Sequence, residues 1–166
     1  MSDNVYLGNP NLKKANTPIE WTEEMMVEFL KCKEDPVYFA KNHVKIVSLD
    51  EGLTQFEPYH FQEKLINNFH HNRFNICKMP RQTGKSTTVV SYLLHYAVFN
   101  DSVNIGILAN KAATARELLG RLQTAYENLP RWMQQGIIAW NKGSLELENG
   151  SKILAASTSA SAVRGM

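Results

Sequence analysis

The stretch Phe74-Asn-Ile-Cys-Lys-Met-Pro-Arg-Gln-Thr-Gly-Lys-Ser-Thr87 decides the fold. The run from Asn75 to Met79 is short and largely apolar, which is typical of a buried strand. After a tight loop, apolar residues recur at helical spacing from Val89 to Val98. This periodicity predicts an amphipathic helix from Lys85 to about Phe99. The Gly-Lys-Ser triplet therefore stands at the junction of a loop and a helix, directly after a predicted strand.

A Gly-Lys-Ser triplet in that position is the geometry of a phosphate-binding P-loop. The first N–H groups of a helix are unpaired and lie at the positive end of its dipole, so phosphates satisfy them. Gly84 lets the backbone approach a ligand closely, Lys85 would reach the β- and γ-phosphates, and Ser86 would offer its hydroxyl to Mg²⁺. The full pattern has a second glycine where this sequence has Met79. An ordinary glycine turn before a helix, with a solvated lysine, is the alternative.

Length and composition are those of a soluble globular protein. The 166 residues can form one domain with a real core, and 43% of them are hydrophobic and 20% charged. A net charge of +2 is too small to indicate nucleic-acid binding alone. Cys32 and Cys77 lack metal-ligand or redox spacing, and the place of Cys77 in the predicted strand indicates a buried free thiol, which fits a reducing cytosol. No apolar run approaches membrane-spanning length, so we expect a cytoplasmic protein without membrane contact.

Before the P-loop, the sequence divides into a flexible lead-in over residues 1–20 and the start of a domain that covers 21–166. Local signals predict the order of the elements. They are a helix capped by Thr22 with an apolar face from Trp21 to Leu30, a helix opened by Asp35-Pro36, a strand over Val44–Leu49 and a helix over Pro58–His71.

Gln62 lies in the last of these helices, some twenty residues before the P-loop. Its amide carries both a donor and an acceptor, so it could pair with an edge of adenine. A surface glutamine on an amphipathic helix is the alternative. Asn141-Lys-Gly-Ser144 superficially resembles a guanine-reading motif, but the required acidic residue is missing, which favours adenine. The adjacent His70 and His71 diverge by about 100° on a helix, so we interpret both as surface residues rather than metal ligands.

After the P-loop helix, the pattern predicts a further strand and helix, then a hairpin. The strand covers Val103–Ala109, the helix Ala112–Asn128, a short helical connector Pro130–Gly136, and the hairpin Leu145–Leu154, with Asn149-Gly150 as a type I′ turn. The order strand, helix, strand, helix indicates a parallel α/β sheet with helices on its faces. Ligands of such sheets bind at the carboxyl ends of the strands, where both 81–86 and Asn110-Lys111 fall.

Five stretches together resemble the N-terminal part of the terminase large subunit, the ATP-driven motor that packages DNA into tailed-bacteriophage heads. The version in long-tailed contractile phages is the most similar. The stretches are Asp35-Pro-Val-Tyr-Phe39, Phe56-Glu-Pro-Tyr-His-Phe-Gln62, Arg81-Gln-Thr-Gly-Lys-Ser86, Ile107-Leu-Ala-Asn-Lys111, and Trp140 to Ser151 with Val163-Arg-Gly165. The family's own P-loop lacks the first glycine, so Met79 ceases to count against nucleotide binding.

The resemblance implies a P-loop NTPase fold of the RecA or helicase-like type, with ATP and Mg²⁺ as cofactors. By the same resemblance, Arg81 and Lys85 are catalytic, and Arg164 matches an arginine that reaches the ATP of a neighbouring subunit; an exposed terminal arginine is the alternative. Tyr59 stands where some relatives carry a basic residue. The nucleotide-binding residues implied are Gln62, Arg81, Gln82, Thr83, Gly84, Lys85, Ser86 and Thr87, with Ser86 on the metal.

The family places a Walker B strand, which ends in Asp-Glu, shortly after the Arg-Gly dipeptide, whereas this sequence reaches only Met166. We therefore expect an incomplete ATPase domain without the Mg²⁺-supporting Asp, the water-activating Glu or the nuclease domain. Such a chain would bind ATP weakly without hydrolysing it.

The function implied is ATP-driven translocation of viral DNA into the procapsid. The partners implied are double-stranded viral DNA, the portal protein, the terminase small subunit and further copies in a ring, in the host cytoplasm at the procapsid portal. A helicase-like translocase and a non-catalytic nucleotide- or protein-binding module remain the alternatives. A second RecA-like domain after Met166 would indicate a helicase.

Overall fold

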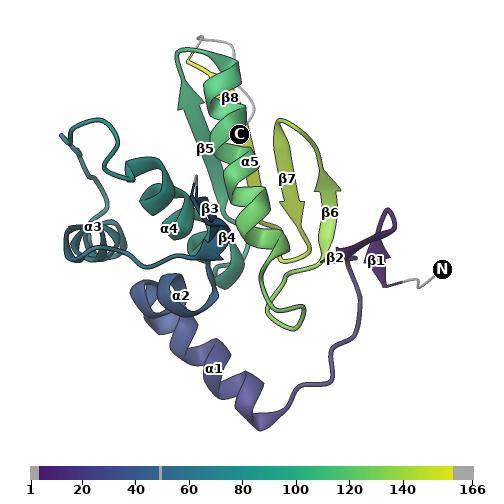
Figure 1. Cartoon of the computed structure of the whole chain (residues 1–166). Helices are drawn as coiled ribbons and strands as arrows, with labels where there is room; N and C mark the ends of the chain where they lie inside the picture. The colour runs from purple at the N-terminus through teal and green to yellow at the C-terminus, as the bar shows by residue number, and fades with distance from the viewer. Residues whose placement is uncertain (1–3, 49, 159–166) are drawn as a thin grey trace.

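A computed structural model of the protein describes residues 4–48 and 50–158. They form an α/β arrangement of helices and mixed sheets (Figure 1). None of the helices in these ranges combines the length and apolar character needed to cross a membrane. In chain order the elements are β1 (Val5–Tyr6), β2 (Asn9–Lys13), α1 (Glu23–Glu34), α2 (Pro36–His43), β3 (Lys45–Ser48), β4 (Gly52–Gln55), α3 (His60–His71), α4 (Lys85–Phe99), β5 (Asn104–Ala109), α5 (Ala112–Glu127), β6 (Ile137–Trp140), β7 (Ser144–Leu147) and β8 (Lys152–Ser157).

The central sheet has the strand order β5-β8-β7-β6. β5 and β8 are parallel, with Asn104 opposite Lys152 and Ala109 opposite Ser157, whereas β8, β7 and β6 form an antiparallel meander. The parallel sheet predicted from the sequence is therefore correct for one strand pair and wrong for the rest. The reason is that β6, β7 and β8 follow one another through short loops, and short loops join antiparallel strands.

One face of this sheet carries the core. Ile105 and Ile107 of β5 and Ile153 of β8 are buried, while Asn104 and Leu108 of β5 are exposed. This alternation is that of a sheet with one packed and one open face. Helix α5 lies against β5 and β8, and α4 packs on α5 (Figure 1).

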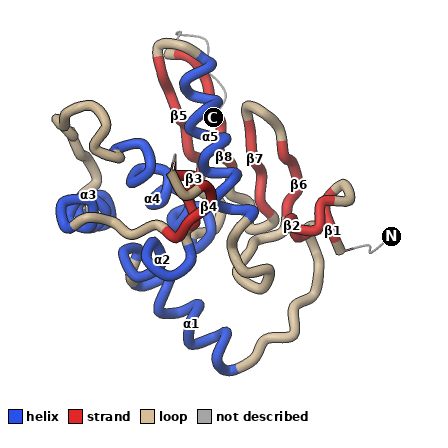
Figure 2. The backbone as a smooth tube through the Cα atoms, viewed as in Figure 1, coloured by secondary structure: helices blue, strands red, loops and turns tan. Residues whose placement is uncertain are grey.

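The strand predicted over Asn75–Met79 is wrong. Residues 74–80 form a loop between α3 and α4, shown in tan in Figure 2. A strand needs a neighbour to pair with, and no strand among the described residues pairs with this segment. Ile76 is fully exposed, and Cys77, predicted to be a buried thiol, is exposed as well. The burial prediction failed because it depended on the strand.

The helices were predicted well because their caps are local. Thr22 Oγ1 accepts a hydrogen bond from Met25 N, and Asp35 Oδ1 accepts from Val37 N and Tyr38 N, as expected for N-caps. Helix α4 has the predicted bounds. Helix α3 begins at His60, two residues later than predicted, and the connector over 130–136 is a turn rather than a helix.

The predicted hairpin of β7 and β8 is present, but its turn is not type I′. That turn requires a positive φ at both central residues, and only Gly150 has one, at 81°. Asn149 instead uses its side chain, since Nδ2 donates to Ala97 O at 2.9 Å and to Asn100 O at 3.1 Å. The hairpin loop is thus fastened to the C-terminal end of α4.

The predicted flexible lead-in over residues 1–20 contains a packed antiparallel hairpin, β1 and β2, among its described residues. Leu12 and Lys13 are almost fully buried. Gln134 accepts a hydrogen bond from Lys13 N and donates one to Asn11 O. Lys13 Nζ lies 3.3 Å from Glu148 Oε1, so this hairpin is joined to the β7–β8 loop.

Candidate functional site at the N-terminus of α4

The candidate site is the loop from Met79 to Gly84 together with the first turn of α4. Gln82 and Gly84 both have a positive φ, 62° and 70°. Gly84 is the N-cap of α4 in the left-handed conformation, which glycine adopts at little cost. Thr83 Oγ1 donates to Pro80 O at 3.1 Å, so the loop is closed by its own hydrogen bonds.

Gln62 contacts this loop directly. It is 4% exposed, and its Nε2 donates to Thr83 O at 3.2 Å while its Oε1 accepts from Tyr59 N at 2.8 Å. A Cβ placed on Gly84 would lie 2.4 Å from Gln62 Nε2. The structure therefore brings together two residues that the sequence singled out separately, and it gives Gly84 a second reason to be glycine. It does not show Gln62 as a surface residue.

Lys85 turns back onto the loop. Its ammonium group donates to Met79 O at 3.1 Å and to Pro80 O. The two carbonyl oxygens thus hold the Lys85 ammonium group beside the loop that leads into α4. The side chain is half-buried, so the charge is only partly hydrated. An anion at this helix terminus could take over from these carbonyls as the partner of Lys85.

The first turn of α4 is suited to an anion. It contains no acidic residue, and no side chain caps it. Thr88 N donates to the carbonyl oxygen of the N-cap residue Gly84 at 2.9 Å, which is the first backbone hydrogen bond of the helix. Ser86 is exposed and Thr87 half-buried, so the Ser86 hydroxyl is open to a ligand. The combination of uncapped N–H groups, a lysine and hydroxyls is what a phosphate group requires.

The contacts of the described residues do not connect the other predicted residues to this arrangement. The Arg81 side chain is exposed, and no described residue bonds to its guanidinium. The loop's hydrogen bonds go to Gln62 and to its own residues, and none joins it to Asn110 or Lys111. Arg164 lies outside the described residues.

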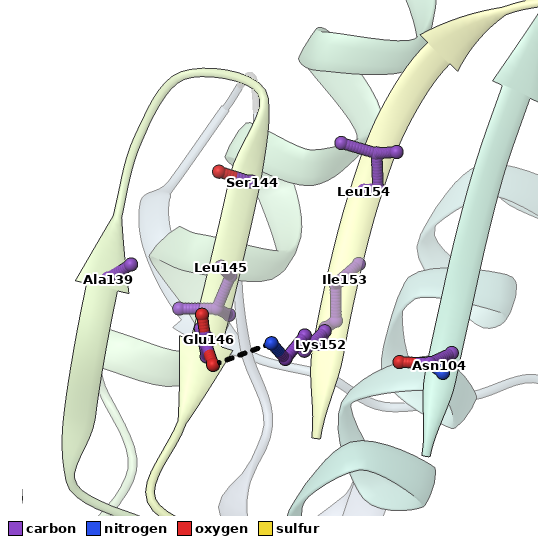
Figure 3. Close-up of a pocket in the computed structure, with 8 residues that line it drawn as sticks. All are labelled: Asn104, Ala139, Ser144, Leu145, Glu146, Lys152, Ile153 and Leu154. Atoms are coloured by element: carbon purple, nitrogen blue, oxygen red, sulfur yellow. Dashed lines mark ion pairs between the residues drawn. The ribbon is translucent and has the colours of Figure 1, made fainter. Parts of the chain in front are cut away.

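A cavity of about 740 Å³ lies between β3, α4 and α5, and Thr87 is the candidate residue in its lining. A hollow of about 350 Å³ lies on the sheet, where Glu146 and Lys152 form an ion pair at 2.9 Å (Figure 3). It contains no predicted site residue.

The sequence reasoning missed two features of the loop. Thr88 is buried, and its Oγ1 donates to Gly84 O at 2.9 Å, which ties the cap to the next turn. The four-residue spacing of Gly84 and Thr88 could have indicated this bond, since Ser and Thr side chains often bond to the carbonyl four residues before. The bonds from Lys85 to the backbone carbonyls of Met79 and Pro80 could not be predicted, because every residue type has such a carbonyl.

The fold and the site together define an α/β protein with a glycine-containing loop at an uncapped helix N-terminus. Residues 76–166 match the family model described as terminase large subunit, T4-like virus type, N-terminal. The chain belongs to this family, and the membership associates it with the packaging of phage DNA. The match begins inside the loop that precedes α4 and therefore includes the whole candidate site apart from Gln62.

Proposed function

We propose that this chain is the N-terminal ATPase portion of a phage terminase large subunit, with the Met79–Thr87 loop and helix start as its ATP site. The observation that carries the proposal is the position of Lys85 at the first residue of an uncapped helix directly after a left-handed Gly84. Family membership supports it. The fold proposed for the complete domain is the P-loop NTPase fold of the RecA or helicase-like type.

The residues of the loop bind different parts of the nucleotide and its metal ion. The backbone N–H groups of Lys85, Ser86 and Thr87 bind phosphate oxygens, and Lys85 exchanges the Met79 and Pro80 carbonyls for the β- and γ-phosphates. The Ser86 hydroxyl is the protein ligand of Mg²⁺, which offsets phosphate charge when it is bound with the nucleotide. Gln82 and Thr83 supply further loop contacts.

Arg81 and Gln62 act at the two ends of the nucleotide. The Arg81 guanidinium is exposed and unbonded within the described residues, so it is free to offset charge on the transferred phosphoryl group. Gln62 is the adenine contact, and Arg164 is proposed to reach the ATP of a neighbouring copy. In the full-length motor, hydrolysis of this ATP would be coupled to the movement of double-stranded viral DNA.

Partners and location follow from the same proposal. The assembled motor would be a ring of identical subunits at the portal of the procapsid in the host cytoplasm, with the small subunit as a further partner. Contacts to DNA would be mainly to phosphates, because a packaging motor must accept any sequence.

Calorimetric titration with ATP–Mg²⁺ tests the proposal. We expect saturable binding, and we expect Lys85→Ala to weaken it by about ten- to a hundredfold, the loss of one charged hydrogen bond to phosphate. Lys78→Ala is the matched control, since it removes an exposed lysine of the same segment and should leave the affinity unchanged. Equal loss in the two variants would show general charge attraction, and unchanged binding by Lys85→Ala would refute the site.

A further inference from the structure

A second group of reactive side chains lies where α1 meets α2, away from the candidate ATP site. Glu28 and Cys32 are four residues apart on α1, so they lie on one face of the helix. His43 is the last residue of α2. One oxygen of Glu28, the sulfur of Cys32 and a ring nitrogen of His43 all lie within 4.8 Å of one another.

The three groups are held in place by their surroundings. Glu28 Oε1 lies 2.7 Å from His43 Nε2 and 3.7 Å from Cys32 Sγ. The other carboxylate oxygen, Oε2, accepts a hydrogen bond from the Tyr38 hydroxyl at 3.0 Å, which restrains the position of the group. The His43 ring stacks on Phe39, with 6.3 Å between the ring centroids. Such partners are what orients metal ligands in proteins.

The cluster of Glu28, Cys32 and His43 is mostly buried but remains partly accessible to solvent. Cys32 is fully buried, whereas the side chains of His43 and Glu28 are 13% and 26% exposed. A cation could therefore enter from the side of Glu28, and a water molecule could complete its coordination. Burial, followed by the nearby Glu28 charge, raises the pKa of Cys32 to about 12, so the thiol carries its proton when no cation is present.

The donor set selects among cations. A carboxylate oxygen, a thiolate sulfur and an imidazole nitrogen suit Zn²⁺ or Co²⁺, whereas Mg²⁺ and Ca²⁺ prefer oxygen ligands only. Bonds of about 2.0–2.3 Å in a tetrahedral site place ligand atoms roughly 3.4–3.6 Å apart. The oxygen–sulfur distance already fits, and the oxygen–nitrogen distance has to open by about 0.7 Å, which a rotation of the Glu28 carboxylate provides.

A purely hydrogen-bonded cluster explains these contacts less completely. Glu28 would accept from His43 and Tyr38, and those bonds do lower the pKa of its carboxyl group, with His43 as the main cause. Cys32 would then contribute one hydrogen bond, from Sγ to Glu28 Oε1 at 3.7 Å, although it is fully buried. A thiol adds little to such a cluster, whereas it is a strong ligand in a metal site.

We propose that Glu28, Cys32 and His43 form a Zn²⁺ site, with water as the fourth ligand, that joins the end of α2 to the middle of α1. On binding, Cys32 releases its thiol proton to solvent, and the proton that His43 Nε2 donates to Glu28 in the metal-free cluster moves through solvent to Nδ1, so that Nε2 can coordinate. The role of the site is structural. His95 of α4 donates to Cys32 O at 2.8 Å, and it follows Lys85 by ten helical residues, so α1 contacts α4 about 15 Å along the helix from its start.

The test is a titration of the 166-residue chain with Co²⁺ as the spectroscopic probe. We expect one equivalent to bind, with a thiolate-to-cobalt charge-transfer band in the near ultraviolet that Zn²⁺ abolishes. Cys32→Ser should remove the band, whereas Cys77→Ser, the matched control at an exposed thiol, should retain it. The absence of a band, or a band that depends on Cys77, would overturn the proposal.

Thermal unfolding provides the second measurement. Zn²⁺ at a hundredfold excess over its Kd should raise the Tm by about 5–11 °C. His43→Gln keeps a donor for Glu28 but lacks the imidazole ligand, so its fold should survive while the Zn²⁺-dependent rise disappears. A folded His43→Gln variant that retains the full rise would refute the site, and this result does not depend on whether Cys32→Ser folds.

Discussion

The substitution Gly84→Ala tests the geometry of the candidate ATP site. Gly84 has a φ of 70°, and an added Cβ would lie 2.4 Å from Gln62 Nε2. The new methyl group therefore meets two separate penalties. One is the left-handed conformation itself, and the other is the position of the Gln62 amide, which is 4% exposed and hydrogen-bonded at both ends.

The two penalties have different sizes and origins. A left-handed conformation costs an alanine roughly 1–2 kcal/mol. Gln62 can move aside only by giving up its bond to Thr83 O, and the loss of one such hydrogen bond costs about 1 kcal/mol. Gly84→Ala should therefore lower the free energy of unfolding by about 2–3 kcal/mol, of which about 1 kcal/mol depends on Gln62.

A double-mutant cycle separates the two parts. The free energies of unfolding of the native chain, Gly84→Ala, Gln62→Ala and the double variant are measured by urea denaturation monitored by circular dichroism. In the Gln62→Ala background, the cost of Gly84→Ala should fall by about 1 kcal/mol, because only the conformational penalty remains. Strictly additive effects would refute the contact between Gln62 and Gly84. A cost near zero in the native background would refute the left-handed conformation as well.

Two further predictions concern stability. Burial lowers the pKa of His95 from 6.5 to about 4. His95 is therefore protonated below pH 6.5 in the unfolded chain, but only below about pH 4 in the folded chain. Stability should therefore fall by up to about 3 kcal/mol between those pH values, and His95→Gln, measured by urea denaturation at each pH, should lose this dependence; an identical pH profile in the variant would contradict the assignment. Asn149→Ala removes two bonds to carbonyls at the end of α4, so it should cost about 2 kcal/mol. Asn141→Ala, which removes one bond from an exposed amide to the Ser144 hydroxyl, should cost less than about 1 kcal/mol in the same assay.

The sequence predicted helices better than strands, for a physical reason. The start of α1 depends on Thr22, that of α2 on Asp35 and that of α4 on Gly84, and each of these residues acts within its own turn. A strand depends on a partner that the local sequence does not contain. The residues of 75–79 are suitable for a strand, yet nothing in the described chain pairs with them. Conversely, β6 was missed although it pairs with β7 directly.

Polar contacts between residues far apart in the sequence could not be predicted either. Asn149-Gly150 has the composition of a type I′ turn. In the structure the Asn149 side chain instead donates to two carbonyls at the end of α4. The Glu28, Cys32 and His43 cluster joins two helices whose angle no residue pattern specifies. In both cases the residue types were visible, and the partners were set by packing.

Gln62 shows how much of the proposed site depends on such a partner. Its spacing from the P-loop carried no physical information, and its amide already has two partners, Tyr59 N and Thr83 O. The amide has a second N–H and a second lone pair on Oε1, so it can contact adenine as proposed while it keeps its bond to Thr83 O. That carbonyl belongs to the residue directly before Gly84, so Gln62 would connect the base to the loop that holds the phosphates. Gln62→Ala should then weaken the binding of ADP and of inorganic triphosphate as well as ATP. If only the nucleotides were affected, Gln62 would act on the base alone, without coupling to the loop.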